Sequence, residues 1–151
     1  MPASPPAGSG VGAAEGGGAG GPARQPFAYA PIRVVPRAER GECLNAGVIL
    51  YCRARRFLAA QTTLDPARLL ALAPDLDLAA VGRQLDLIRL LCAGDPAAGP
   101  IAHLPQPERF GWLVAPASTV VQPGPVHAGL TTDPAATLER LFATMVRLPA
   151  A

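Results

Sequence analysis

One periodic segment constrains the fold more than any other part of this sequence. Its apolar residues recur at intervals of three, four, three and four positions, at Leu78, Val81, Leu85, Ile88 and Cys92. This spacing predicts a helix with one apolar face, and Asp77 stands where a side chain can cap its first turn. Another element has to cover that face, because neither a helix nor a sheet can bury its apolar side alone.

The segment before this helix has the character of antiparallel strands. Residues 27–35 are rich in β-branched and aromatic side chains, and Pro31 among them favours an edge position or a bulge. Residues 44–53 form a nearly continuous apolar run, and residues 57–63 end in two threonines. Gly41 is the expected turn residue ahead of the apolar run. These features predict a three-stranded meander that covers the helix.

Two Asp-Pro pairs predict further helix starts. An aspartate accepts hydrogen bonds from first-turn amides, and a proline at the first helical position has no amide hydrogen to lose. Asp65-Pro66 predicts a short helix that ends near Ala73, and Asp133-Pro134 predicts the last helix of the chain.

The remaining segments are rich in Pro and Gly. Residues 94–132 are interrupted by both, with short strand-like pieces at 118–122 and 126–130. Within residues 1–26, 13 positions are Gly or Pro, which predicts a disordered tail. We therefore expect a single α+β domain over residues 27–151. It would consist of an antiparallel sheet of three to five strands with about three helices packed on one face.

The charged residues exclude several classes of chemistry. All 13 basic residues are Arg, and the sequence contains no Lys. The chain therefore has no lysine for a Schiff base, a phosphate-binding loop or a kinase strand. A formal net charge of +2 gives no support for nucleic-acid binding. The one basic cluster, Arg53, Arg55 and Arg56, is interpreted as a solvated turn.

The cysteines and the hydropathy pattern favour the cytoplasm. Cys43, Cys52 and Cys92 form no CxxC pair, so neither a disulfide framework nor a zinc site is predicted. The apolar stretches are too short to span a bilayer, and no signal-peptide pattern is found. We expect a cytoplasmic protein with no metal site, no cofactor and no membrane contact.

The turn after the first expected strand leads into an unusual strand start. The sequence Arg-Gly-Glu-Cys-Leu-Asn-Ala-Gly-Val contains Asn45 and Gly47, which both disfavour a regular buried strand. One interpretation is structural, with Glu42 paired to Arg33 or Arg40. In it, Asn45 caps a bulge and Gly47 makes room for a packed helix. The other interpretation is functional, because Arg, Glu and Asn at one end of a sheet can orient an anionic or polar group.

A second polar group follows in the Pro-rich and Gly-rich segment. Arg109 and the only Trp, Trp112, lie in the sequence Arg-Phe-Gly-Trp, ahead of the hydroxyl side chains of Ser118 and Thr119. We interpret Trp112 as a core residue. His127 has the usual interpretation of a lone histidine, a structural residue held by hydrogen bonds.

Two functional hypotheses from different classes follow. In the first, the chain is a non-catalytic binding or accessory module whose two polar segments converge at one end of the fold. The candidate residues of this site, which would dock a protein or an anionic ligand, are Arg33, Arg40, Glu42, Asn45, Arg109, Trp112 and His127.

In the second hypothesis the chain is an enzyme, either a small hydrolase or a nucleic-acid-processing enzyme. Glu42 and His127 would share proton transfer, and Arg40 or Arg109 would stabilise a developing anion. A third possibility is a structural subunit of an oligomer, which a large exposed apolar patch would indicate.

Two sets of residues carry a resemblance to a known family. They are Ile32-Arg33-Val34-Val35-Pro36 with Arg40-Gly41-Glu42, Asn45 and Gly47-Val48-Ile49-Leu50, and later Arg109-Phe110-Gly111-Trp112, residues 118–122 and 125–127, and Gly129. Through them the chain resembles the uncharacterised bacterial family named domain of unknown function 3037, over about residues 29–148. The resemblance implies a small cytosolic domain without an assigned activity. It also implies a HipA-like kinase as a partner, because members of the family are often encoded near such kinases.

Overall fold

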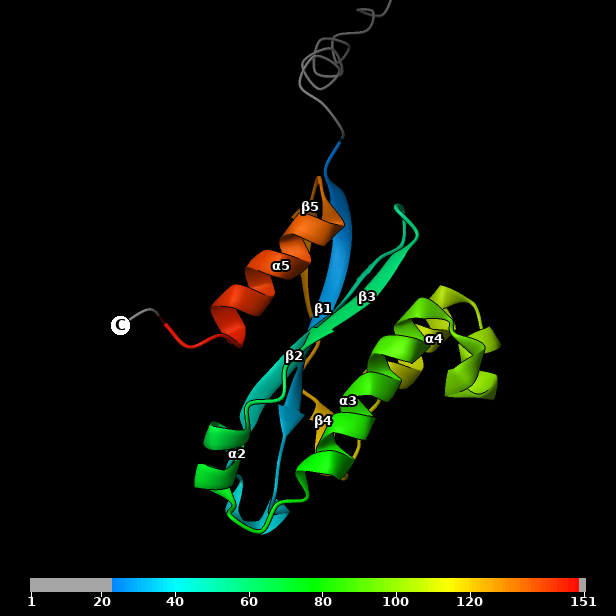
Figure 1. The fold of residues 1–151 in the computed structure, drawn as a ribbon. Coiled ribbons are helices and arrows are strands. Elements are labelled where there is room, and N and C mark those ends of the chain that lie inside the picture. The colour runs from blue at the N-terminus through cyan, green and yellow to red at the C-terminus, as the bar shows by residue number, and fades with distance from the viewer. Residues whose placement is uncertain (1–22, 150–151) are drawn as a thin grey trace, which may run out of the picture.

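The computed structural model describes residues 23–149 of the chain. These residues form a five-stranded antiparallel sheet and four α-helices, which confirms the α+β class (Figure 1). The strands are β1 (Gln25–Val34), β2 (Leu44–Cys52), β3 (Phe57–Thr62), β4 (Val121–Pro123) and β5 (His127–Thr131). The α-helices are α2 (Pro66–Leu72), α3 (Leu78–Ala93), α4 (Gln106–Val114) and α5 (Pro134–Met145), and the 3₁₀ turns are η1 (Ala38–Arg40), η2 (Pro96–Ala98) and η3 (Pro100–His103).

The first strand begins inside the segment that the sequence assigned to a tail. Of the tail predicted over residues 1–26, residues 1–22 lie outside the described part of the chain. Gln25 and Pro26 already pair with β5. Among the helices within residues 23–149, none has the length and apolar character needed to cross a membrane.

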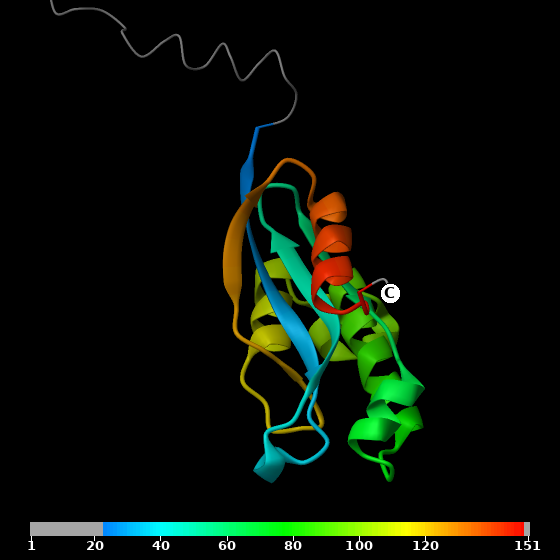
Figure 2. The same cartoon turned by 90° about the vertical axis from the view of Figure 1, so that its left-hand side faces the viewer.

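Strand β1 lies inside the sheet, contrary to the edge position that Pro31 suggested. One side of β1 pairs with β2, and the other side pairs with β5 over residues 25–29 and with β4 over residues 32–34. Pro31 lies between these last two pairings, where the amide of Gly124 donates to its carbonyl oxygen at 2.8 Å. The amide hydrogen that proline lacks would therefore point into the interruption between β4 and β5, where no ladder bond is lost. Figure 2 shows the segment that carries both strands along the outer side of β1.

The predicted meander of β1, β2 and β3 is confirmed, and it contains a bulge beside Asn45. The pairing of β2 with β1 shifts between Asn45 and Gly47, so Ala46 is the extra residue. A Cβ at Gly47 would lie only 2.7 Å from the carbonyl oxygen of Gln61 in β3. Gly47 therefore makes room for the neighbouring strand β3. The expectation that it makes room for a packed helix is wrong.

Three of the four helices cover one face of the sheet, as expected, and the fourth covers the other face. On one face α2, α3 and α4 supply Leu69, Val81 and Phe110 to a core with the strands. On the other face α5 packs Leu138 and Phe142 against β1 and β2. Figure 1 shows α5 on one side of the sheet and α3 and α4 on the other. Both layers are needed because the apolar run of β2 is buried on both of its faces.

Helix α4 lies in the segment that the sequence predicted to be irregular. It begins beside Pro107 and contains Gly111, the two residue types that indicated loops. Its apolar residues Phe110, Leu113 and Val114 nevertheless have helical spacing and pack into the core with α3. The two polar residues of the second motif, Arg109 and Trp112, are therefore presented by a helix.

Candidate functional site

Arg109 is buried and holds the end of a neighbouring helix. Its Nη1 donates to the carbonyl oxygens of Leu91 at 2.8 Å and Cys92 at 2.7 Å, and its Nε donates to Leu104 at 2.9 Å. The first two carbonyls belong to the last turn of α3, which has no amide partners for them within the helix. Gly94 ends that helix with φ of 70° and leaves room for the guanidinium. The guanidinium of this candidate residue is therefore engaged in hydrogen bonds to the protein's own backbone.

Asn45 is also used in packing. Its side-chain amide donates to the carbonyl oxygen of Met145 at 3.1 Å, at the C-terminal end of α5. Arg68 of α2 donates to the next carbonyl, that of Val146, at 3.2 Å. The two donors join the start of β2 and the helix α2 to the end of α5.

Trp112 is exposed, which corrects its interpretation as a core residue. Its relative exposure is 61%. The helix α4 that carries it packs on the face of the sheet opposite to α5, whereas Asn45 contacts α5. Trp112 and Asn45 therefore lie on opposite faces of the sheet, so these two residues of the candidate site do not belong to one continuous surface.

The two residues proposed to share proton transfer are far apart. His127 pairs with Tyr29, with their rings 5.4 Å apart, and Val34 pairs with Leu44. The five positions from Tyr29 to Val34 extend about 17 Å along the strand. Glu42 lies beyond that end of the sheet, in the turn between β1 and β2. The arrangement lacks the contact that joint acid-base catalysis by Glu42 and His127 requires.

Arg33, one of the two partners expected for Glu42, does not form an ion pair with it. It pairs with Gln122 of β4, and its guanidinium lies over Gly124, where a Cβ would be 2.9 Å from Cζ. The Nε of Arg33 is buried and makes no hydrogen bond with the described residues. Glu42 pairs instead with Arg40, the other expected partner.

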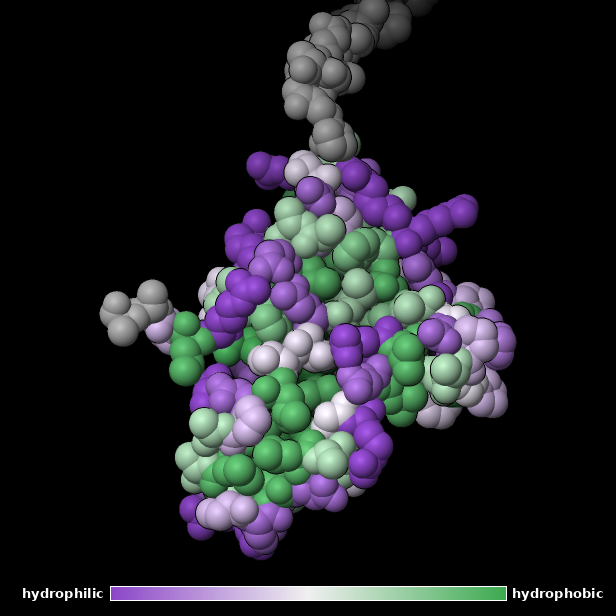
Figure 3. All heavy atoms as spheres, viewed as in Figure 1, coloured by the Kyte–Doolittle hydropathy of each residue, from purple (hydrophilic) through white to green (hydrophobic). Residues whose placement is uncertain are grey.

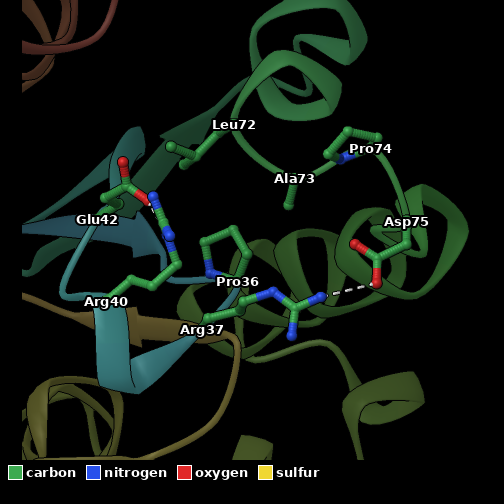
Figure 4. Close-up of a pocket in the computed structure, with 8 residues that line it drawn as sticks. All are labelled: Pro36, Arg37, Arg40, Glu42, Leu72, Ala73, Pro74 and Asp75. Carbon is green, nitrogen blue, oxygen red and sulfur yellow. Dashed lines mark hydrogen bonds and ion pairs between the residues drawn. The ribbon is translucent and has the colours of Figure 1, made fainter.

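The Arg40–Glu42 pair belongs to a groove at the end of the sheet where β1 turns into β2. One wall is this turn, which contains η1 and is closed by Gly41 with φ of 69°. The facing wall is the connection between α2 and α3. The two walls enclose a cavity of about 210 Å³ whose lining is drawn in Figure 4: Pro36, Arg37, Arg40, Glu42, Leu72, Ala73, Pro74 and Asp75.

An ion pair crosses from one wall of the groove to the other. Arg37 Nη2 lies 3.0 Å from the Asp75 carboxylate, as Figure 4 shows. On its far side is a second cavity of about 240 Å³, which shares Pro36, Arg37, Ala73 and Asp75 with the first. The other residues that line this second cavity are Leu76, Asp77, Ala80, Val81, Gln84 and Val120. The groove thus consists of two adjoining cavities separated by one exposed ion pair.

The charges of the groove are exposed and mutually satisfied. The hydrogen bond from Arg40 lowers the pKa of Glu42 below its ordinary value, and the positive charge of Arg40 acts in the same direction. That hydrogen bond also raises the pKa of Arg40. Both ion pairs are solvent-accessible, so the attraction between their charges is screened by water and contributes little to stability. A carboxylate from another molecule could therefore replace either partner with little loss.

Sequence reasoning found only half of the groove. Arg40 and Glu42 were identified because they lie two positions apart in one motif. Arg37 and Asp75 were missed because 38 positions separate them. The only sequence signal for Asp75 was the Ala-Pro-Asp turn between two predicted helices. Such a turn indicates an exposed loop, but it does not indicate which residue the loop contacts. Within residues 23–149, no group of three His, Cys, Asp or Glu side chains is placed to hold a metal ion.

Comparison with known proteins gives one match. The family model described as protein of unknown function (DUF3037) matches residues 29–146. A search of the curated proteins and a search of the solved structures each found no match.

Proposed function

The chain belongs to the family of proteins of unknown function named DUF3037, and we propose that it is a non-catalytic binding module that docks an extended segment of a partner protein in the groove. The observation that carries the proposal is the pair of adjoining cavities with guanidinium groups at the rim and apolar side chains below them. Pro36, Leu72 and Leu76 supply apolar surface. Arg37 and Arg40 supply positive charge beside the carboxylates of Glu42, Asp75 and Asp77.

The size of the cavities favours a peptide over a small molecule. Each cavity is below the roughly 300 Å³ at which pockets for small organic ligands begin. A cavity of 210 or 240 Å³ can take one side chain of moderate size. Two such cavities side by side suit two side chains of one extended segment that crosses the Arg37–Asp75 pair.

The charges indicate which segment would fit. Arg37 and Arg40 are already paired, but in exposed pairs that are weak and exchangeable. A segment with an acidic side chain could form charge-assisted hydrogen bonds with either guanidinium. Small apolar side chains next to it would enter the cavities. We therefore expect the partner to present an exposed segment that is acidic and moderately apolar.

The family resemblance supplies the first partner to test, a HipA-like kinase. We place this binding in the cytoplasm, because three cysteines without a pairing pattern suit a reducing compartment. The proposal contains no catalytic residue.

The test compares two double variants that remove the same charge. Arg37→Ala with Arg40→Ala removes both guanidiniums of the groove, and Arg83→Ala with Arg89→Ala removes two exposed ones from α3. Binding of a purified HipA-like kinase to each is measured by titration calorimetry. We expect the groove variant to bind at least about tenfold more weakly than the parent and the α3 variant to bind within about twofold of it.

Two failures of this experiment have different meanings. If the kinase binds the groove variant as tightly as the parent, the groove is the wrong site. If the kinase does not bind the parent, the partner is wrong. Thermal unfolding of both variants should match the parent, because surface substitutions of this kind change stability by about 0.5 kcal/mol or less.

A further inference from the structure

A third cavity lies outside the groove, at the opposite end of the sheet, where β2 turns into β3. Its volume is about 360 Å³, larger than either cavity of the groove. It is lined by Tyr51, Arg53, Arg56, Gln106 and Pro107. Hydrophilic side chains project from this end of the molecule in Figure 3, around the turn that joins the two strands. The proposed docking of a partner segment does not use this cavity.

The two arginines that line the cavity have no acidic partner in the described part of the chain. Arg53 and Arg56 are exposed and form no ion pair within residues 23–149. The third arginine of the turn, Arg55, does not line the cavity and donates to the carbonyl oxygen of Ala23 at 3.0 Å. Two guanidinium groups at the rim of one cavity, with neither neutralised, are suited to a doubly charged oxyanion.

The backbone of the turn is held in an uncommon conformation at the cavity. Arg56 has φ of 49°, the only positive value at a non-glycine residue among those the structure describes. Gln106 of α4, which also lines the cavity, donates from Nε2 to the Arg56 carbonyl oxygen at 2.9 Å. A side chain from another element thus fixes the residue whose guanidinium stands at the rim. Such outliers persist where surrounding structure enforces them, and they concentrate at ligand sites.

The floor of the cavity is aromatic and apolar. Tyr51 is half-buried, with its ring packed on Phe110 at a centroid distance of 5.2 Å, so its orientation is fixed. Pro107 adds a second rigid apolar surface beside it. The cavity is a shallow, open depression, and a flat ring can lie on these two side chains.

We propose that this cavity binds a small aromatic phosphate monoester, such as a nucleoside monophosphate. Arg53 and Arg56 hold the phosphate, and Tyr51 and Pro107 contact the ring. The phosphate carries nearly two negative charges at neutral pH and so matches the two guanidiniums. The ring contact adds affinity that inorganic phosphate cannot gain.

A comparison of four ligands tests the proposed chemical class of the ligand. Titration calorimetry of the full chain uses AMP, phenyl phosphate, inorganic phosphate and adenosine as separate probes. We expect AMP and phenyl phosphate to bind at least about tenfold more tightly than either inorganic phosphate or adenosine, since only they make both kinds of contact. If neither AMP nor phenyl phosphate binds more tightly than both adenosine and inorganic phosphate, the proposed ligand class is wrong. A stronger response to AMP than to phenyl phosphate assigns the site to nucleotides, and the reverse assigns it to phenolic phosphates.

Variants of the turn locate the site. Arg53→Ala and Arg56→Gly each remove a guanidinium from the rim, and both should weaken AMP binding about tenfold or more. Arg55→Ala removes the same charge from the same turn but not from the cavity, so AMP binding should stay within about twofold of the parent. Equal weakening in all three variants would mean that AMP senses only the net charge of the turn, and the cavity would be excluded as its site.

The glycine variant also separates binding from folding. Glycine adopts positive φ without steric strain, so Arg56→Gly should fold at least as stably as the parent while it loses the phosphate contact. Its thermal unfolding midpoint should therefore equal or exceed that of the parent. A variant that is stable and binds AMP like the parent overturns the role given to Arg56.

Discussion

Arg109 is buried although it carries a charge, and its hydrogen bonds explain why the fold tolerates it. Each of the three carbonyls that it reaches lies where a helix or a 3₁₀ turn ends, and of these the Leu91 carbonyl also accepts from the amide of Gly94. Asn45 and Arg68 act in the same way on α5. Several polar residues that stand out in this sequence therefore complete the backbone hydrogen bonding of helix ends, a use that a sequence motif does not distinguish from a binding site.

The first prediction removes the buried guanidinium. Arg109→Met keeps a long flexible side chain but leaves the carbonyls of Leu91 and Cys92 buried without that donor. We expect the free energy of unfolding to fall by about 2–4 kcal/mol, the range for breaking a buried charged network. Urea denaturation measures it, with Arg89→Met on the exposed face of α3 as the control. A loss no greater than in that control would show that Arg109 does not hold the helix end.

The second prediction concerns the three thiols. Burial raises the pKa of Cys92 to about 12, against the smaller opposing effect of the Arg109 charge. Cys43 is exposed, and Cys52 and Cys92 are buried. Because the thiolate is the reactive form, iodoacetamide should modify only Cys43 in the folded protein at about pH 8 and all three thiols in urea. Mass spectrometry counts the adducts, and modification of Cys92 as fast as Cys43 would contradict the burial.

The same shift predicts a loss of stability in alkali. A thiol whose pKa is higher in the folded state stays protonated there while the unfolded state ionises. The stabilisation from Cys92 is complete below the ordinary thiol pKa and declines as the pH rises toward about 12. Denaturant titrations at increasing pH should show this decline in the parent and a smaller one in Cys92→Ala. Equal declines would assign the effect to other groups.

At the scale of elements, the helices and strands whose own residues carry a local signal, such as a capping aspartate, were predictable. The aspartates at 65, 77 and 133 each accept a hydrogen bond from the amide three residues on, at Arg68, Ala80 and Ala136, so these three helix starts are confirmed. The meander was predictable because its strands are adjacent in sequence. Signals of this kind lie within one turn or one strand, and tertiary contacts do not override them.

The parts that were wrong depend on neighbours far away in sequence. Pro31 is compatible with an inner strand only because β4 and β5 leave a gap at that position. Helix α4 forms despite Gly111 because Phe110 and Leu113 are buried against α3. The gap beside Pro31 and the packing of α4 on α3 cannot be inferred from the neighbouring residues in the sequence. Each depends on which distant segment lies next to the residue in the fold.

The third prediction uses two glycines with opposite surroundings. At Gly111 in α4, an added Cβ would meet nothing within 4 Å, so Gly111→Ala should stabilise the protein by about 1 kcal/mol through helix propensity. At Gly47 in β2 the added Cβ would lie 2.7 Å from the Gln61 oxygen, so Gly47→Ala should destabilise by about 1–3 kcal/mol. Thermal and urea unfolding of both variants measure these changes. Two changes of the same sign would contradict the placement of one of these elements.

At the scale of the molecule, the sequence did not reveal how the helices divide between the faces of the sheet. An apolar helix face and an apolar strand indicate that another element must pack against them. They do not indicate which face of the sheet each helix packs on. The two motifs of the candidate site are separated in the same way, because Asn45 contacts α5 whereas α4, which carries Arg109 and Trp112, packs on the opposite face. The groove joins Arg37 to Asp75 across 38 positions, and this proximity exists only once α2 and α3 have packed on the sheet.

The last prediction concerns how α5 is fixed as the separate layer of the fold. Its apolar side chains pack on β1 and β2, while Asn45 and Arg68 hold the carbonyls of Met145 and Val146. Replacing either donor by Ala should lower the free energy of unfolding by about 1 kcal/mol, the usual value of one such hydrogen bond. Because both donors hold the same helix end, the double variant should deviate from additivity by about 0.5 kcal/mol or more.

Hydrogen exchange shows whether this loss is confined to one layer. If the donors fix α5 as a unit, the amides of α5 should exchange faster in the double variant, while those of β1 and β2 keep the protection set by global unfolding. Arg140→Ala is the matched control, because it removes an exposed arginine from α5 and leaves both carbonyl contacts intact. Faster exchange in β2 to the same extent as in α5 would mean that the helix and the sheet open together. In that case the two donors would contribute to the whole domain, and α5 would not be a layer that can detach by itself.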